Sequence, residues 1–142
     1  MPAQETNSPK YKTKAALEEK RKSQIENYVG AYNHFDVDGM VADLSPDVVF
    51  ENISNGAVNL RTEGVEAFRQ QATAATAYFT EREQTVESWT FTANTIVIDI
   101  AYRALLATDL PNGMKRGETL LLTGQSEFQF ADGRIVRITD RS

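Results

Sequence analysis

The stretch YVGAYNHFDVDGMVADLSPDVVFEN, residues 28–52, decides the fold more than any other part of this chain. It reads as the end of one helix, a tight turn around Asp36-x-Asp38-Gly39, a short second helix and an entering strand. Asp38 has a side chain suited to an N-cap, so we expect the short helix over residues 39–44, ended by the Ser-Pro that follows. The strand is expected at residues 48–52, where β-branched and aromatic residues follow one another.

Helical spacing occurs on both sides of this stretch. A helix is expected over residues 15–34, with apolar side chains three and four positions apart. Asn55-Gly56 is a strong signal for a hairpin turn, and the returning strand closes near Leu60. A third helix is expected from residue 62 to about residue 78. Its apolar stripe comprises Val65, Phe68, Ala72, Ala75 and Phe79.

After Thr80 the apolar period changes from about 3.6 residues to 2, which indicates strands. Turn residues divide the remainder into strands at residues 82–92, 95–108, 118–131 and 134–141. Helices followed by an antiparallel meander predict an α+β domain. We expect residues 1–14 to form a flexible arm and residues 15–142 to form a single domain.

Composition excludes several classes of function. The chain has 142 residues, no cysteine, one histidine and a net charge of −5. Disulfides and thiolate catalysis are therefore excluded, and we expect neither a metal nor another cofactor. The acidic charge argues against nucleic-acid binding, while the six Lys and Arg residues among residues 1–22 read as a solvated arm. With no long apolar segment, membrane binding is not expected and the cytoplasm is the expected location.

Strand alternation divides the inward side chains from the outward ones. On the strands at residues 95–108 and 118–131 the even-numbered residues are the apolar, inward ones, and on the last strand Val136 and Ile138 continue that face. Trp89 and Phe91 share a face that is also expected to point inward. The next inward position on the last strand is Asp140. A carboxylate there lies either in water beyond the end of the sheet or in an interior pocket, where it would act as an acid, a base or a ligand partner.

The order and spacing of many residues resemble the nuclear transport factor 2-like superfamily, which includes ketosteroid isomerase, limonene epoxide hydrolase and the SnoaL-like polyketide cyclases. The resemblance implies a cone-shaped half-barrel with a pocket, in which three N-terminal helices pack on a strongly curved, mixed, mostly antiparallel sheet. The residues that carry it are Tyr28-Val29, Asn33, Asp36-x-Asp38-Gly39, Val41-Ala42, Asp47, Glu51, Gly64, Arg69, Asn94, Phe128-x-Phe130 and Gly133.

The catalytic positions of two relatives are only partly retained. Ketosteroid isomerase uses a carboxylate base and an oxyanion hole made of a tyrosine and a protonated Asp. Tyr28 matches the tyrosine. However, Asn52 occupies the position of the carboxylate base, and Ser126 occupies the position of the protonated Asp. In the comparison with limonene epoxide hydrolase, Asp140 matches one of that enzyme's two acidic residues. Asn52 matches the Asn that helps to position water. The positions expected to carry its Arg and second Asp read Ile100 and Tyr102 here. Neither reaction is expected by its usual route.

What remains is an apolar concavity with a few convergent polar groups, as in a small-molecule site. We assign candidate catalytic roles to Asp140, Asn52 and Tyr28. For the aromatic candidates, packing in the core is the competing interpretation. The candidate ligand-binding residues are Tyr32, Phe50, Phe68, Trp89, Tyr102, Ser126 and Phe128.

Two functions fit these residues. The first is a SnoaL-like pocket protein that acts on an apolar carbonyl or cyclic compound as a cofactor-independent isomerase, cyclase or hydrolase. The second is a non-catalytic ligand carrier or dimerising association module of the same fold. The sequence leaves open whether the protein is an enzyme. The resemblance implies a homodimer formed through the outer face of the sheet, where Val97, Ala101, Leu105 and Leu121 lie among Thr and Gln residues.

Overall fold

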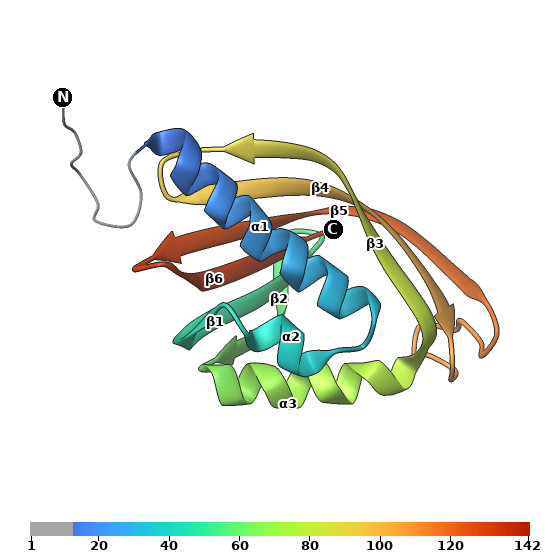
Figure 1. Cartoon of the computed structure of the whole chain (residues 1–142). Coiled ribbons are helices and arrows are strands. Elements are labelled where there is room, and N and C mark those ends of the chain that lie inside the picture. Colours follow the sequence, from blue (N-terminus) through green and yellow to red (C-terminus); the bar gives the residue numbers. More distant parts are fainter. Residues whose placement is uncertain (1–12) are drawn as a thin grey trace, which may run out of the picture.

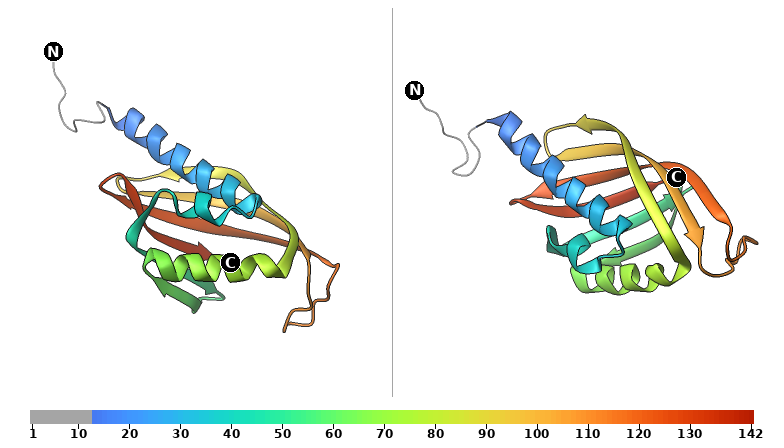
Figure 2. Two further views of the ribbon diagram at one scale, coloured as in Figure 1. Left: turned by 60° about the horizontal axis from the view of Figure 1, so that its bottom comes forward. Right: turned by 45° about the vertical axis from the view of Figure 1, so that its right-hand side comes forward.

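A curved six-stranded sheet with helices on its concave side forms the domain (Figures 1 and 2). The computed structural model describes residues 13–142, so nearly all of the expected arm over residues 1–14 lies outside the described residues. The elements in chain order are α1 Lys14–Asn33, α2 Val37–Val41, β1 Leu44–Ser54, β2 Ala57–Glu63, α3 Val65–Ala75, the 3₁₀ turn η1 Thr76–Tyr78, β3 Phe79–Phe91, β4 Thr95–Leu106, β5 Thr119–Ala131 and β6 Arg134–Arg141.

The strands lie in the order β2-β1-β6-β5-β4-β3. The β1–β6 pair is parallel and the other pairs are antiparallel, which confirms the expected mixed, mostly antiparallel sheet of an α+β domain. Because β6 is the last strand and lies beside β1, the end of the chain is placed in the middle of the sheet. Of the three helices in residues 13–142, α1 and α2 precede the sheet, whereas α3 follows β2 (Figure 1).

The concave side holds the core. Ile25 and Val29 of α1 pack against the inward residues of β4 and β5, among them Ile98 and Phe128. The expected inward residues Ile96, Ile98, Ile100, Ala104 and Leu106 of β4 are all buried. Burying large apolar side chains is the main favourable term in folding, so this alternation fixes which face of the sheet turns toward the helices.

The expected boundaries of the second helix were wrong. It runs over Val37–Val41, and its N-cap is Asp36, whose carboxylate accepts from the Gly39 N–H at 3.0 Å. Asp38 lies in the first turn instead and pairs with Arg69 of α3. The strand that follows therefore starts earlier than expected, at Leu44, which pairs with Ile135 of β6.

One inward position on β6 was also assigned wrongly. A bulge between Gln129 and Phe130 shifts the pairing of β5 with β6. As a result Ile135, not Val136, is fully buried, and the expected alternation resumes only at Ile138. A bulge places two residues of one strand opposite one residue of the other, so the side-chain parity changes across it.

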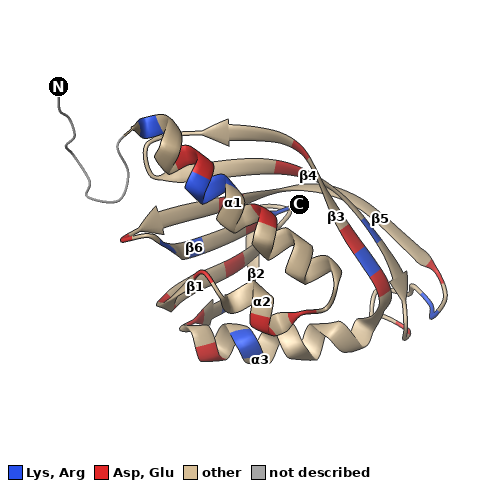
Figure 3. Cartoon of the chain, in the orientation of Figure 1, with Lys and Arg blue, Asp and Glu red and all other residues tan. Residues whose placement is uncertain are grey.

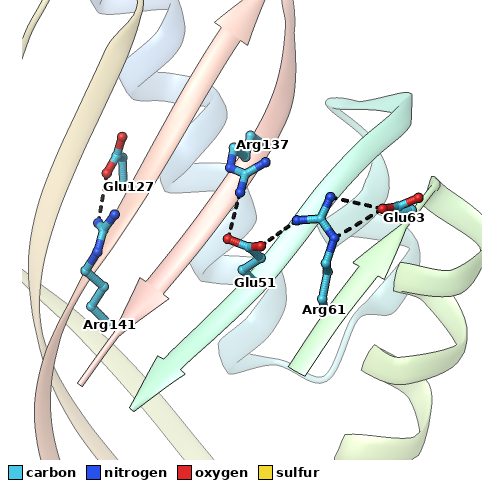
Figure 4. Close-up of polar contacts among 6 residues, drawn as sticks. All are labelled: Glu51, Arg61, Glu63, Glu127, Arg137 and Arg141. Carbon is cyan, nitrogen blue, oxygen red and sulfur yellow. Dashed lines mark hydrogen bonds and ion pairs between the residues drawn. The ribbon is translucent and has the colours of Figure 1, made fainter. Parts of the chain in front are cut away.

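The convex face of the sheet is polar along β2, β1, β6 and β5. Glu51 accepts from Arg61 and from Arg137, and Arg61 also contacts Glu63 (Figure 4). Arg141 and Glu127 form a further ion pair on the same face. Residues of both charge signs are interspersed over the helices and strands (Figure 3). Within residues 13–142 no helix is both long enough and apolar enough to cross a bilayer.

Candidate functional site

Two adjoining cavities lie in the concave side of the sheet and share Tyr32, Gln84 and Asp140. The inner cavity has a volume of about 140 Å³ and the outer one about 280 Å³. The inner cavity is lined by Tyr28, Tyr32, Met40, Phe50, Leu60, Phe68, Gln71, Ala72, Ala75, Arg82, Gln84 and Asp140. The outer cavity is lined by Tyr32, Asn52, Ser54, Gln84, Ile100, Tyr102, Leu122, Thr123, Gly124, Gln125, Ser126, Asp140, Arg141 and Ser142.

A larger open groove of about 640 Å³ lies elsewhere, between α2, α3 and the start of β3. It is bordered by residues such as Asp38, Arg69 and Thr80, none of which is buried. The candidate residues inferred from the sequence gather around the two interior cavities instead, so the interior is the better site.

Asp140 lies where the two cavities meet. It is on β6, opposite Asn52 of the parallel strand β1 and Ser126 of the antiparallel strand β5. The Ser126 hydroxyl donates a hydrogen bond of 2.6 Å to its carboxylate. Burial raises the pKa of Asp140 from its ordinary value of 3.8 to about 6, although the bond from Ser126 acts in the opposite direction. A carboxyl group with such a pKa exchanges protons readily near neutrality.

Tyr28 of α1 points its ring into the apolar wall, where the rings of Tyr28 and Phe128 meet edge to face at 5.6 Å. Burial, and secondarily the charge of Asp140, raises the pKa of the Tyr28 hydroxyl well above 10.0, so the group stays protonated. Among the described residues this hydroxyl has no hydrogen-bond partner, and Tyr28 lines the inner cavity. It can therefore donate to an oxygen atom of a ligand.

Tyr32 and Tyr102 form a second polar group at the outer cavity. The Tyr32 hydroxyl donates to the Tyr102 hydroxyl at 2.9 Å. Burial raises the pKa of both hydroxyls. This pair connects α1 to β4 at the outer cavity.

Phe50 and Phe68 form the apolar wall of the inner cavity, with ring centroids 5.6 Å apart and nearly perpendicular planes. Asn52, two residues along β1, faces the outer cavity only. Its amide donates to Asn59 of β2 at 2.9 Å, so one of its donors is already used.

Two aromatic residues proposed from the sequence do not line either cavity in the described part of the chain. Phe128 is buried in the core beneath Tyr28. Trp89 packs against the core and stacks on Phe91 with centroids 6.2 Å apart, and Lys22 lies over its ring. For these two side chains, packing accounts for their environment.

Arg82 lines the inner cavity but was missed in the sequence analysis. It is on β3 and only 5% exposed, and its Nε donates to the Tyr32 carbonyl at 2.8 Å. The odd-numbered Trp89 and Phe91 of the same strand were expected to point inward, so the parity of the strand did not mark Arg82 as an inward residue. The register shift between Val86 and Ser88, which changes the parity, is not visible in the sequence. No group of three His, Cys, Asp or Glu side chains suited to a metal ion occurs among residues 13–142.

Comparison with known proteins relates this arrangement to one family. The family model of the SnoaL-like domain matches residues 25–138. A comparison with curated proteins found no match. Among solved structures, a candidate polyketide cyclase from Xanthomonas campestris is 23% identical, with 87% of this chain and 90% of that chain covered and a TM-score of 0.74. A candidate SnoaL-like polyketide cyclase from Jannaschia sp. CCS1 is 15% identical, with 96% and 90% covered and a TM-score of 0.75.

TerC, a protein crystallised with polyporic acid, is 15% identical, with 85% of this chain and 88% of that chain covered and a TM-score of 0.69. At these identities the likeness shows a shared fold and leaves the ligand open. Together with the family match, it confirms the resemblance inferred from the sequence.

Proposed function

The chain belongs to the SnoaL-like domain family, and on that premise we propose that it binds a small cyclic or carbonyl-bearing molecule in the interior cavities and moves a proton on it through Asp140. The observation that carries the proposal is the placement of this buried carboxyl group between two cavities, in one of which it lies with Tyr28, whose hydroxyl has no hydrogen-bond partner among residues 13–142. Perturbed carboxyl groups in concave apolar sites are typical of acid–base catalysis.

The proposed reaction is a proton transfer next to a carbonyl group. The Asp140 carboxylate removes a proton from the carbon beside the carbonyl. The electron pair of that C–H bond forms a carbon–carbon double bond, and the π pair of the carbonyl group moves to its oxygen. The Tyr28 hydroxyl donates to this oxygen as its charge develops, which lowers the barrier. The protonated Asp140 then returns the proton to the same or another carbon, so the protein is unchanged at the end. Asn52 holds a polar group of the ligand in the outer cavity.

The size of the inner cavity supports a ligand that inserts one ring. A cavity of about 150 Å³ lined by apolar side chains holds a molecule of the size of benzene, and the inner cavity has about 140 Å³. A larger ligand would extend past Asp140 into the outer cavity. Phe50 and Phe68 would contact the faces and edges of the inserted ring.

The test is deuterium exchange at the carbon beside the carbonyl of cyclohexanone and cyclohexenone, followed by proton NMR in heavy water. The wild-type protein should accelerate exchange, and Asp140→Asn should reduce the acceleration at least tenfold, because the amide cannot accept the proton. Asp99→Asn is the matched control, since Asp99 lies in the same sheet and accepts from Ser88 and Gln125, but does not itself line either cavity. Equal exchange in the wild type and Asp140→Asn would refute the catalytic role.

A non-catalytic ligand carrier is the second candidate. The engaged amide of Asn52 and the hydrogen bond between Tyr32 and Tyr102 favour it, because both reduce the number of free groups that could take part in a reaction. A carrier would bind the same ketones without accelerating exchange.

We also propose that two copies associate through the convex side of β3, β4 and β5. The ion pairs of Glu51 lie beside this region, on β1, β2 and β6 (Figure 4). Within the region, Glu127 and Glu81 have arginine partners, and Leu121 of β5 is 70% exposed. Val97, Ala101 and Leu105 are the other apolar side chains at the outward positions there.

A further inference from the structure

The guanidinium group of Arg82 is almost without polar partners inside the domain. Arginine carries five N–H donors and no acceptor, and it stays charged at any pH at which the protein folds. Among residues 13–142, the Nε of Arg82 donates to the Tyr32 carbonyl at 2.8 Å, and a contact with the Tyr32 hydroxyl has a minor influence on the pKa of that tyrosine. The Nη2 atom of Arg82 is buried and has no partner among these residues. The two N–H donors of Nη2 are therefore unused.

Aromatic rings hold the group in place. The centre of the guanidinium lies 3.7 Å from the centroid of the Tyr32 ring and 4.6 Å from that of Phe35. Such contacts stabilise a cation, but they do not use its N–H donors, which lie in the guanidinium plane. Burial of a charged group without a paired anion is costly, so this arrangement lowers the stability of the fold unless something else uses those donors.

No carboxylate of the described residues forms an ion pair with Arg82. Glu81 and Glu83 are its neighbours in sequence and border a surface cavity with it, but both are exposed. Glu81 pairs with Arg103 of β4 instead. Asp140 also lines the inner cavity, but its carboxylate accepts from Ser126. By contrast, Glu51 on the convex face contacts two arginines.

We propose that Arg82 binds an anionic oxygen of the ligand, so that the molecule taken into the inner cavity is an organic acid: a cyclic compound that bears a carboxylate or an ionised enol. This inference rests on the proposed function, since it names the class of molecule that the cavity takes. The ring lies against Phe50 and Phe68, and its acidic group lies at the end of the cavity formed by Arg82. Asp140 and Tyr28 line the same cavity and remain available for the carbon and oxygen atoms that react.

The test compares acids with uncharged molecules of the same shape. Benzoate and benzamide form one pair of probes, and the ionised enol of dimedone and uncharged cyclohexenone form the other. The two pairs distinguish a carboxylate ligand from an enolate. Dissociation constants are measured by amide NMR titration of the wild type, Arg82→Met, Arg82→Lys and Arg103→Gln. Arg103 is the matched control because it lies near Arg82 but borders a different cavity, on the surface of the molecule, that is neither the inner nor the outer one.

We expect the wild type to bind at least one acid about tenfold more tightly than its uncharged counterpart, since hydrogen bonds to a charged group are stronger than neutral ones. Arg82→Met should remove this preference, because it lowers the affinity for the acids far more than the affinity for benzamide and cyclohexenone. Arg82→Lys should retain part of it, because lysine keeps the charge but loses the planar fork. If circular dichroism shows that Arg82→Met does not fold, the wild type and Arg82→Lys carry the test. Arg103→Gln should bind as the wild type does.

Equal affinity for the acids and their uncharged counterparts, or a preference that Arg82→Met and Arg82→Lys leave intact, would overturn the inference. The interior would then still bind small molecules, so the proposed function would stand. A preference lost in Arg103→Gln would place the anion on the surface and would also overturn it. Conversely, a preference that depends on Arg82, together with unchanged ketone exchange in Asp140→Asn, would support the acid site and refute the proton transfer.

Discussion

Replacing Asp140 with asparagine should make the protein more stable at neutral pH. The pKa of Asp140 is raised from its ordinary value of 3.8 to about 6 in the folded protein, because the carboxyl group is buried. The folded protein therefore binds this proton more tightly than the unfolded chain does. Consequently the contribution of Asp140 to the free energy of unfolding is highest below about pH 4, and it falls as the pH rises through about 6.

The size of the effect follows from the shift. One pKa unit corresponds to about 1.4 kcal/mol, so the shift to about 6 amounts to a loss of about 3 kcal/mol at neutral pH. This value is an upper bound, because part of the residue remains accessible through the outer cavity. An asparagine side chain at this position lacks the charge, but its oxygen can still accept the hydrogen bond from Ser126.

Urea unfolding of the wild type and Asp140→Asn, at several pH values between about 4 and 7, measures the difference. We expect the variant to be more stable than the wild type by about 1–3 kcal/mol at neutral pH and the difference to shrink toward about pH 4. Asp99→Asn should behave in the opposite way. Hydrogen bonds from Ser88 and Gln125 lower the pKa of Asp99, so its charged form stabilises the fold at neutral pH. A difference between the wild type and Asp140→Asn that does not change with pH would refute the burial of a chargeable group.

Three further predictions concern the surroundings of the site. A double-mutant cycle of Tyr32→Phe and Tyr102→Phe should reveal a coupling of about 1 kcal/mol in the free energy of unfolding, because either single substitution breaks the same hydrogen bond. Additive effects would contradict the bond. Gly124→Ala should lower the stability by about 1–3 kcal/mol in urea unfolding, since the added Cβ would lie 2.6 Å from the Arg141 carbonyl oxygen. A neutral effect would mean that β6 moves freely there. Leu121→Glu should convert a dimeric wild type into a monomer in light scattering without changing the melting temperature, as Leu121 is 70% exposed. A dimer in both proteins would exclude this face.

Much of the architecture could be predicted because local signals agree with it. Asn55 and Gly56 have φ angles of 53° and 78°, as a two-residue hairpin turn requires, and both residue types tolerate such angles. The alternation on β4 holds throughout, since its inward residues are buried on the concave side and a shift by one would expose them. Asp140 could be singled out for the same reason, because it continued an apolar face.

The missed features depend on how strands pair. The β6 bulge opposite Phe130 changes the parity at Val136, and the irregularity between Val86 and Ser88 does the same on β3. Because of the latter, Arg82 and Trp89 both face inward although one is even-numbered and the other odd-numbered. A reading based on apolar alternation also passes over an inward arginine, since the pattern treats charge as a sign of solvent.

Charged residues have ion-pair partners on the convex face of the sheet but not at two positions on the concave face. That difference is the strongest physical argument for function. On the convex face, Glu51 and Glu127 have arginine partners in contact. On the concave face, among residues 13–142, the Asp140 carboxylate accepts from a serine hydroxyl, and Arg82 contacts a backbone carbonyl and two aromatic rings but forms no ion pair. A sequence selected for stability alone would place apolar residues at both positions, since isolated buried charges lower stability. Asp140 and Arg82 both depart from the local rules of folding, and both line the inner cavity. We therefore expect this cavity to take a ligand that pairs with both groups.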